Sequence, residues 1–290
     1  MPVEVPGGNG ATYRVFDVHQ HMPPVRPDGD PEPTPEKLQS RISLMDDWGI
    51  DWACLQAPGG WPPTVTSRVV NETLVAYRSS HPDRYIAAIG TVHALGGRRE
   101  IEELERIAEE PLLDGVAWHH KLQGTNIDHP AMLDALRICQ EAGLPAFIHC
   151  WQDSGPPEFP WRLADLAEKF PAVTFLALDS MSSMVHTGWL VQIAKHHPNI
   201  WFDTAMLSTS GKVLESIVNQ IGDDRVLLGC NPFGENANFN YPAPIYDVLY
   251  ASLPSESKEK ILSLNALRLL GIDMPDQTAS GNSVGEAPAT

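Results

Sequence analysis

The feature that most constrains the fold of this chain is an alternation of short apolar runs with longer amphipathic segments. Eight apolar runs have the length of strands, and each is followed by a segment with the apolar spacing of a helix. Such alternation is typical of parallel strands joined by helical crossovers. The predicted strands are residues 15–21, 52–56, 85–92, 115–119, 144–149, 173–178, 200–203 and 225–229. The predicted helices are residues 35–48, 67–80, 98–110, 131–141, 161–170, 185–197, 212–221 and 255–269.

The number and length of these units favour a closed barrel, because eight of them fit in roughly 250 residues. The main rival is an open, doubly wound sheet, in which a glycine-rich turn after the first strand binds phosphate. Here that turn reads His19-Gln20-His21-Met22-Pro23-Pro24 and contains no glycine. The sequence therefore predicts an α/β fold made of a single (β/α)8 TIM barrel.

The barrel is predicted to occupy residues 12–272, since no change of composition marks a domain boundary within them. Residues 1–11 are rich in glycine and proline and predict an N-terminal arm. Residues 273–290 are mostly polar or small and predict a disordered tail. The loop of residues 22–35 carries six prolines, so we expect it to be ordered only as a lid or rim.

The net charge and the cysteine content indicate in which compartment the protein is located and which class of partner it binds. The formal net charge is −17 at pH 7, so nucleic acids and other polyanions would be repelled. No apolar run approaches the roughly 20 residues that cross a bilayer, and the first ten residues lack the pattern of a signal peptide. The four cysteines are scattered without a CxxC pair, which is typical of reduced thiols. We therefore expect a cytoplasmic protein that binds a small-molecule substrate, with no nucleic-acid or membrane partner.

Two histidines end the first predicted strand, one residue apart. Side chains alternate between the faces of a strand, so His19 and His21 project to one side and Gln20 to the other. Neutral imidazole is a common zinc ligand, and two imidazoles on one face can chelate a divalent metal. The pattern also fits a polar strand end with two unrelated surface histidines, and it does not by itself choose between the two.

Polar residues also end the other predicted strands, where the chemistry of a (β/α)8 barrel is located. Any strand must end in something polar, but histidines follow strands one, three, four and five in a chain with only 11 histidines. This concentration favours a site at the mouth of the barrel. The strand-end residues are, in chain order, His19 and His21, Gln56, His93, His119, His120 and Lys121, His149, Asp179, Asp203 and Asn231.

A series of motifs along the chain resembles the amidohydrolase superfamily, in the branch that also holds aminocarboxymuconate-semialdehyde decarboxylase and related decarboxylases. Each motif is weak alone, but their order and spacing are specific for the family fold, from residue 16 to about residue 272. The motifs are Asp17-Val18-His19-Gln20-His21, Met45-Asp46-Asp47-Trp48-Gly49-Ile50-Asp51, His81-Pro82-Asp83-Arg84-Tyr85, Gly143-Leu144-Pro145-Ala146-Phe147-Ile148-His149, His197-Pro198-Asn199-Ile200, Asp224-Arg225-Val226-Leu227-Leu228-Gly229 and Asn265-Ala266-Leu267-Arg268-Leu269-Leu270.

The resemblance implies a divalent metal, zinc first, on His19, His21 and His149. Family members usually carry another histidine after strand six and an aspartate after strand eight, where this chain has Asp179 and Asn231. An amide cannot act as a general base near neutral pH, although it can hydrogen-bond a substrate or a water. Asp179 could compensate by completing a tetrahedral site or by acting as the acid–base group. The alternative is a site that has lost its metal, in which the histidines bind a substrate anion or transfer protons.

Further residues near the strand ends are candidates for substrate binding. The resemblance places His119 in the substrate pocket, and Lys121 could supply a charge there or be a solvated lysine. Asp203 could orient a neighbouring histidine or cap the following turn. Three tryptophans follow strand ends, where their rings could line a pocket or pack in the core or an interface. They are Trp61, Trp118 and Trp151.

The activity expected first from the resemblance is hydrolysis of a small cyclic or carboxylated metabolite by metal-activated water, since hydrolysis is the commoner activity of the superfamily. Asp179, His119 and Asn231 are the predicted catalytic residues. One alternative is a metal-independent or divergent lyase, such as a non-oxidative decarboxylase, a lactonase or a cyclase. Another is an inactive barrel that only binds a small molecule. The resemblance also implies a homodimer.

Overall fold

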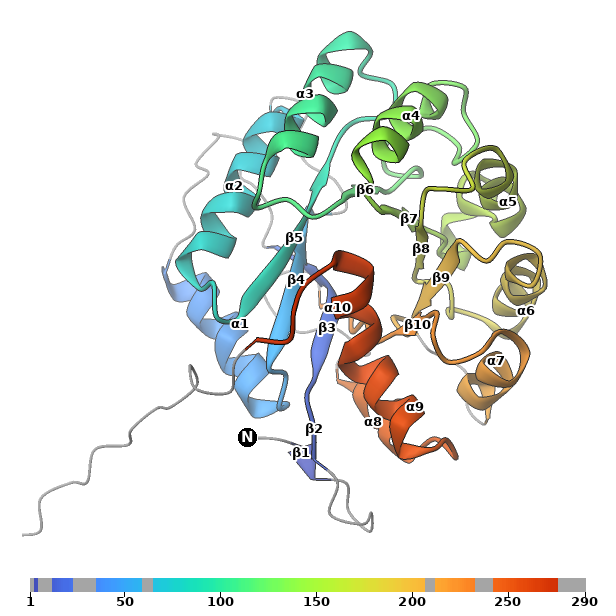
Figure 1. Cartoon of the computed structure of the whole chain (residues 1–290). Helices are drawn as coiled ribbons and strands as arrows, with labels where there is room; N and C mark the ends of the chain where they lie inside the picture. The colour runs from blue at the N-terminus through green and yellow to red at the C-terminus, as the bar shows by residue number, and fades with distance from the viewer. Residues whose placement is uncertain are drawn as a thin grey trace, which may run out of the picture.

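The computed structural model describes residues 3–4, 12–22, 35–58, 65–206, 212–232 and 242–275. A parallel eight-stranded sheet curves into a barrel with helices around its outer face (Figure 1). Neighbouring strands follow the chain order from first to last, as the alternation of apolar and amphipathic segments predicts. The predicted (β/α)8 barrel is confirmed. Its strands are β3 (Phe16–His21), β4 (Trp52–Gln56), β5 (Tyr85–Thr91), β6 (Val116–Trp118), β7 (Ala146–His149), β8 (Phe175–Leu178), β9 (Ile200–Asp203) and β10 (Val226–Leu227).

Helices follow the strands in turn, the first seven between successive strands and α8 after the last one, and they bury their apolar faces against the barrel. Their ends follow local signals: Thr66 caps α2 through a hydrogen bond from the backbone of Val69, and Gly143 ends α4 in the left-handed conformation that favours glycine. None of the described helices is long and apolar enough to cross a membrane. They are α1 (Pro35–Asp47), α2 (Ser67–Ser80), α3 (Arg98–Glu109), α4 (Met132–Ala142), α5 (Pro160–Lys169), α6 (Met184–Ala194), α7 (Val213–Ile221) and α8 (Ala243–Tyr250).

Parts of the predicted arm, loop and tail lie outside the described residues. Within the arm, β1 (Val3–Glu4) pairs antiparallel with β2 (Thr12–Tyr13) just before the barrel. The proline-rich loop is not described over residues 23–34, nor is the tail from residue 276 onward. The lid and the disordered tail therefore stay predictions.

Two apolar clusters lie on opposite faces of the sheet and set the direction of the functional side chains. Phe147 belongs to the cluster inside the barrel, whereas Ala146 and Ile148 belong to the larger cluster beneath the helices. Because side chains alternate along a strand, His149 continues the inward row of Phe147 at the C-terminal end of β7. The same alternation turns Trp118 of β6 outward, into the cluster beneath the helices.

The barrel closes between β3 and β10 through individual backbone hydrogen bonds. The Val18 N–H donates to the Leu228 carbonyl at 2.9 Å, and the Asn231 N–H donates to the His19 carbonyl at 2.9 Å. On its other side, β3 carries a bulge, since Asp17 pairs with Ala53 whereas Gln20 pairs with Leu55. Bulges re-aim side chains at barrel rims, and this one lies between Asp17 and Gln20, where it includes His19 and directly precedes His21.

A C-terminal helical segment covers the other end of the barrel, with α10 over its middle in Figure 1. It comprises α9 (Ser255–Glu259), a π-helical segment η3 (Lys260–Leu264) and α10 (Asn265–Leu270), where the sequence predicts one regular helix. The carbonyl of Ile261 in η3 accepts the Leu228 N–H at 2.8 Å. The Asn265 side chain donates to the Val226 carbonyl at 2.8 Å, and Leu267 packs in the inner cluster. The C-terminal helix thus holds β10 in place.

His120 makes the stability of this fold sensitive to acid. Burial lowers the pKa of His120 to about 4, and its Nε2 lies 3.5 Å from the Met132 sulfur. The ordinary pKa of histidine is about 6.5, so between pH 6.5 and 4 the unfolded chain binds a proton that the native state does not. We expect the free energy of unfolding to fall by about 2 kcal/mol more in the wild type than in His120→Leu between pH 7 and 5. Urea titrations with a chelator present measure both, and equal losses would contradict this assignment.

Candidate metal and acid–base site

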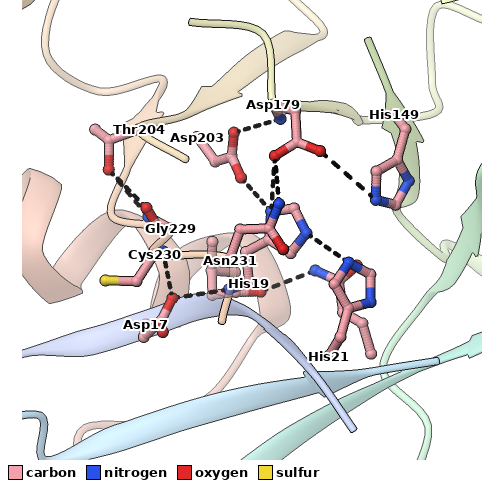
Figure 2. A network of polar contacts seen from close by, with 12 residues as sticks. Asp17, His19, His21, His149, Asp179, Asp203, Thr204, Gly229, Cys230 and Asn231 are labelled. Carbon is pink, nitrogen blue, oxygen red and sulfur yellow. Dashed lines mark hydrogen bonds and ion pairs between the residues drawn. The ribbon is translucent and has the colours of Figure 1, made fainter. Parts of the chain in front are cut away.

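Three buried histidines from two strands converge at the C-terminal mouth of the barrel (Figure 2). His19 and His21 end β3, and His149 ends β7. The Nε2 atoms of His19 and His21 are 3.1 Å apart, and one ring nitrogen from each histidine lies within 4.8 Å of the other two. This is the group that the resemblance predicts as the metal ligands.

The other ring nitrogen of two of these histidines is bound to a backbone carbonyl. His21 Nδ1 lies 2.5 Å from the Ala57 carbonyl oxygen, and His149 Nδ1 lies 2.9 Å from the Trp118 carbonyl oxygen. A carbonyl oxygen can only accept a hydrogen bond, so Nδ1 carries the hydrogen and Nε2 keeps a lone pair. This tautomer is the one in which a histidine binds a metal through Nε2.

His19 is oriented by a buried carboxylate. Its Nδ1 lies 2.6 Å from Asp203 Oδ2, and Asp203 Oδ1 accepts the backbone N–H of Asp179 at 2.9 Å. Burial raises the pKa of Asp203 well above its usual range, while the Asp179 N–H favours the carboxylate form. Of the two roles that the sequence leaves open for Asp203, the structure supports the orientation of a histidine.

The three imidazoles fit a divalent cation. Burial lowers the pKa of His19, His21 and His149, so the rings are neutral ligands near neutral pH. When Asp203 is a carboxylate, His19 Nδ1 carries the hydrogen as His21 Nδ1 does, and the two Nε2 atoms of β3 face each other as acceptors with no hydrogen to share. His149 Nε2 is buried and has no hydrogen-bond partner in the described part of the chain. Two nitrogens on one tetrahedral zinc ion are roughly 3.3 Å apart, close to the 3.1 Å between His19 and His21.

Asp179 and Asn231 form a hydrogen-bonded pair beside the histidines. Asn231 Nδ2 donates to Asp179 Oδ1 at 2.8 Å, while Asp179 Oδ2 lies 4.0 Å from His149 Nε2. Burial raises the pKa of Asp179 to about 6. Both residues have left-handed backbones, with φ of 57° and 48°, which aspartate and asparagine tolerate better than most residues. Such conformations are often kept where they aim a functional side chain.

Asp17 ties the first strand to the last and is a residue that sequence reasoning missed. Its Oδ1 accepts the backbone N–H of His19 at 3.1 Å and that of Cys230 at 2.9 Å. Burial raises its pKa to about 6. Asp17 thereby fixes the backbone that carries His19 on one side and Asn231 on the other. Its place in the first motif was visible in the sequence, but its partner lies 213 residues away.

His119 directly follows β6, and its ring stacks on one of the three histidines. Its ring is parallel to that of His149, with centroids 4.3 Å apart and planes 13° apart. Its Nδ1 lies 2.7 Å from Oε1 of Glu158, a buried glutamate that the sequence analysis did not single out. Only the turn Gly155-Pro156-Pro157-Glu158 after β7 hinted at an ordered loop there.

The predicted substrate-binding residues do not lie together in one place. The Trp118 ring is 1% exposed and packs beneath the helices, so its contribution to the site is the carbonyl that orients His149. This placement favours the core role that the sequence left open for this ring. Lys121 Nζ donates to the Asp153 carbonyl at 2.8 Å and lies over the half-buried Trp151 ring, so these two residues meet at the rim. Trp61 lies outside the described residues.

Gly229 leaves room for the carboxylate that orients His19. A Cβ at this position would lie 2.7 Å from Asp203 Oδ2 and 3.1 Å from Asp203 Cβ. We therefore expect Gly229→Ala to displace Asp203 and to weaken zinc binding roughly 10- to 100-fold, the usual cost of losing a residue that orients a ligand. Gly188→Ala is a matched control, because a Cβ at Gly188 of α6 meets nothing within 4 Å. Competition with a chromophoric chelator measures both, and equal affinities would refute the steric argument.

Comparison with known proteins shows the family of this chain. The family model described as amidohydrolase matches residues 16–272. The chain belongs to the amidohydrolase family. The chain is also 24% identical over 251 residues to 2-amino-3-carboxymuconate-6-semialdehyde decarboxylase of Dictyostelium discoideum, covering 71% of this chain and 67% of the relative.

Solved structures share the fold of this chain at low sequence identity. The 5-carboxyvanillate decarboxylase of Sphingomonas paucimobilis has a TM-score of 0.68 and 16% identity, over 90% of this chain and 100% of that one. The 5-carboxyvanillate decarboxylase of Novosphingobium aromaticivorans, in complex with manganese and 4-hydroxy-3-methoxy-5-nitrobenzoic acid, has a TM-score of 0.67 and 16% identity, over 93% and 99%. A 2,6-dihydroxybenzoate decarboxylase bound to 2,6-dihydroxybenzoate has a TM-score of 0.59 and 17% identity, over 89% and 98%.

Proposed function

We propose that this protein is a divalent-metal-dependent, non-oxidative decarboxylase of a small unsaturated or aromatic carboxylic acid. The observation that carries the proposal is the convergence of three neutral imidazole nitrogens beside a buried carboxyl group, Asp179, that can hold a proton. The relatives named above support the choice of reaction, since each of them is a decarboxylase.

His19, His21 and His149 are the residues that would hold the metal. A divalent ion bound there acts as a Lewis acid that neutralises the negative charge of the substrate. The net charge of the three neutral histidines is zero, and Asn231 adds none. The three histidines therefore would not cancel the positive charge of a bound divalent ion. That charge would attract an anionic carboxylate substrate.

Asp179 supplies the proton that replaces the carboxylate. Decarboxylation forms a bond between this proton and the carbon that carries the carboxylate. The bond from that carbon to the carboxylate then breaks, its electron pair stays with the carbon, and CO2 leaves. With a pKa of about 6, Asp179 is protonated in part of the molecules near neutral pH. Asn231 donates to Oδ1, which leaves Oδ2, the oxygen nearer His149 Nε2, to carry the proton.

Hydrolysis is the activity that the sequence analysis put first, and the same histidines would serve it. The relatives named above remove CO2 instead, so we place decarboxylation before hydrolysis. The choice changes the product, because hydrolysis adds water across a bond and decarboxylation exchanges a carboxylate for hydrogen.

Turnover with and without metal tests the proposal. The protein is stripped with a chelator, reloaded with Zn2+ or Mn2+, and given carboxymuconate semialdehydes, carboxyvanillate and dihydroxybenzoates. We expect release of CO2 only from the reloaded protein and, in D2O, one deuterium at the carbon that carried the carboxylate. Equal turnover with a chelator present would favour the metal-independent lyase. Water addition without CO2 release would favour a hydrolase, and binding without turnover would favour an inactive barrel.

A further inference from the structure

Two loops at the mouth of the barrel are joined by a buried glutamate. The loop after β7 forms two short 3-10 turns, η1 (Gln152–Ser154) and η2 (Pro156–Glu158). The Glu158 side chain that ends η2 is 0% exposed. Its Oε1 lies 2.7 Å from His119 Nδ1 and accepts the Lys121 backbone N–H at 3.0 Å. A glutamate is rarely buried without such partners, because burying a charge alone is costly.

Glu158 is a carboxylate in this position. Burial by itself would raise its pKa, but the hydrogen bonds from His119 and from the Lys121 N–H hold the pKa of Glu158 below its usual value. A carboxylate can only accept hydrogen bonds, so His119 Nδ1 carries the hydrogen and Nε2 is the nitrogen free for chemistry.

The loop that carries Glu158 is fixed by contacts that are independent of His119. The Pro157 carbonyl accepts the Ile127 N–H at 3.1 Å, and the Pro156 carbonyl accepts Arg162 Nε at 2.8 Å. Arg162 in turn forms an ion pair with Asp128 at 2.6 Å. Glu158 is therefore held in place before any substrate arrives, as a residue that orients a catalytic imidazole must be.

We propose that Glu158 is a positioning residue that makes His119 the second proton-transfer group of the site. This inference rests on the proposed function for its catalytic part. A carboxylate at Nδ1 fixes the imidazole tautomer and stabilises the imidazolium that forms when Nε2 takes up a proton. The parallel stacking of His119 on His149 places this imidazole next to the metal ligands and in the same cluster as Asp179.

The pair of acid–base groups suits a substrate with a hydroxyl group conjugated to the carboxylated carbon. His119 Nε2 takes the hydroxyl proton, which raises the electron density at that carbon, and Asp179 gives its proton to the carbon. After CO2 leaves, the imidazolium returns its proton to the oxygen, and Asp179 regains one from water. The net change is one proton consumed and one CO2 released.

The first arm of the test needs no substrate. A hydrogen held between imidazole Nδ1 and a carboxylate gives a proton resonance far downfield, and the signal of His119 is assigned by its loss in His119→Gln. We expect this resonance to move upfield in the isosteric variant Glu158→Gln, because a neutral amide is a weaker acceptor. The matched control is Glu103→Gln on α3, since Glu103 is also buried and hydrogen-bonded but contacts Asn71 and Arg106. An unchanged His119 resonance in Glu158→Gln would overturn the proposal, even if the protein proves to be a decarboxylase.

The second arm separates positioning from loop stability. We expect Glu158→Gln to lower kcat roughly 100-fold with KM and metal content within about threefold of wild type, as expected for a group needed in proton transfer. Glu103→Gln should keep kcat. If the wild type decarboxylates but Glu158→Gln keeps its kcat, the positioning role is refuted and the proposed function stands. If no decarboxylation is found while the resonance moves as expected, the proposed function fails and the positioning of His119 is retained.

Discussion

Asp179→Asn should lower kcat by roughly 100- to 10,000-fold and leave the metal bound. The expected loss is that of a general acid, because an amide of the same shape cannot give a proton to carbon. The metal should stay, since its ligands are the three imidazoles and not Asp179. Steady-state kinetics and elemental analysis of the same preparation measure both quantities. Loss of the metal together with activity would mean that Asp179 acts as a ligand instead.

The double variant Asp179→Asn/Asn231→Asp is the matched control for this prediction. It keeps one acid and one amide in the pair. The hydrogen bond of 2.8 Å between the two side chains should remain, with residue 179 as the donor and residue 231 as the acceptor. The carboxyl group, however, moves from the end of β8 to the segment after β10, away from the oxygen position 4.0 Å from His149 Nε2. We expect kcat to remain below a tenth of wild type. Recovery beyond that level would show that the reaction needs a carboxyl group hydrogen-bonded to an amide, whichever of the two positions carries the carboxyl group.

His19→Ala/His21→Ala should abolish metal binding and turnover together. Wild type should retain one divalent ion per chain and gain thermal stability when Zn2+ or Mn2+ is added, because a ligand that binds only the native state stabilises it. The double variant removes two of the three imidazoles and should show neither effect. Elemental analysis and a thermal-shift titration measure them without a substrate.

His93→Ala is the control variant, because it removes a histidine that follows a strand but does not belong to the three-histidine cluster. His93 follows β5 and accepts a hydrogen bond at Nδ1 from the Leu95 N–H, outside the three-histidine cluster. Its variant should bind metal like wild type. If the double variant kept its thermal shift with Zn2+, the site would have to be located elsewhere.

The fold was readable from the sequence because its periodicity is local. Strand β3 was expected at residues 15–21 and is Phe16–His21, and β4 was expected at its observed bounds. The last strand is shorter than expected, with two residues, because β10 and β3 meet through single hydrogen bonds instead of a ladder. The π-helical segment η3 was missed, since it follows from a carbonyl of the helix bonding to a strand and not from helix propensity.

From the periodicity of the residues alone, the site was readable only where one strand carried the information, whereas His149, Asp179 and Asn231 were located through the family resemblance. Two histidines separated by one residue must share a face, so the pairing of His19 with His21 followed from the period of a strand. Glu158 could not be recognised in the same way, because it reaches His119 across 39 residues and sits in an irregular loop. Gly229 likewise acquires its role only from the approach of Asp203. Long-range contacts of this kind leave no periodic trace in the sequence.

The C-terminal helix has a consequence for the order in which the protein can be completed during synthesis. Leu228 finds the acceptor for its N–H only at Ile261, and Val226 receives the side chain of Asn265. A nascent chain that has reached residue 232 holds every residue of the three-histidine cluster, yet β10 then lacks the two hydrogen bonds that the C-terminal helix supplies. We therefore expect the closure of the barrel between β3 and β10 to become stable only after residue 265 has emerged from the ribosome. A chain that stalls before that point leaves the inner apolar cluster uncovered and becomes a target for chaperones and proteases.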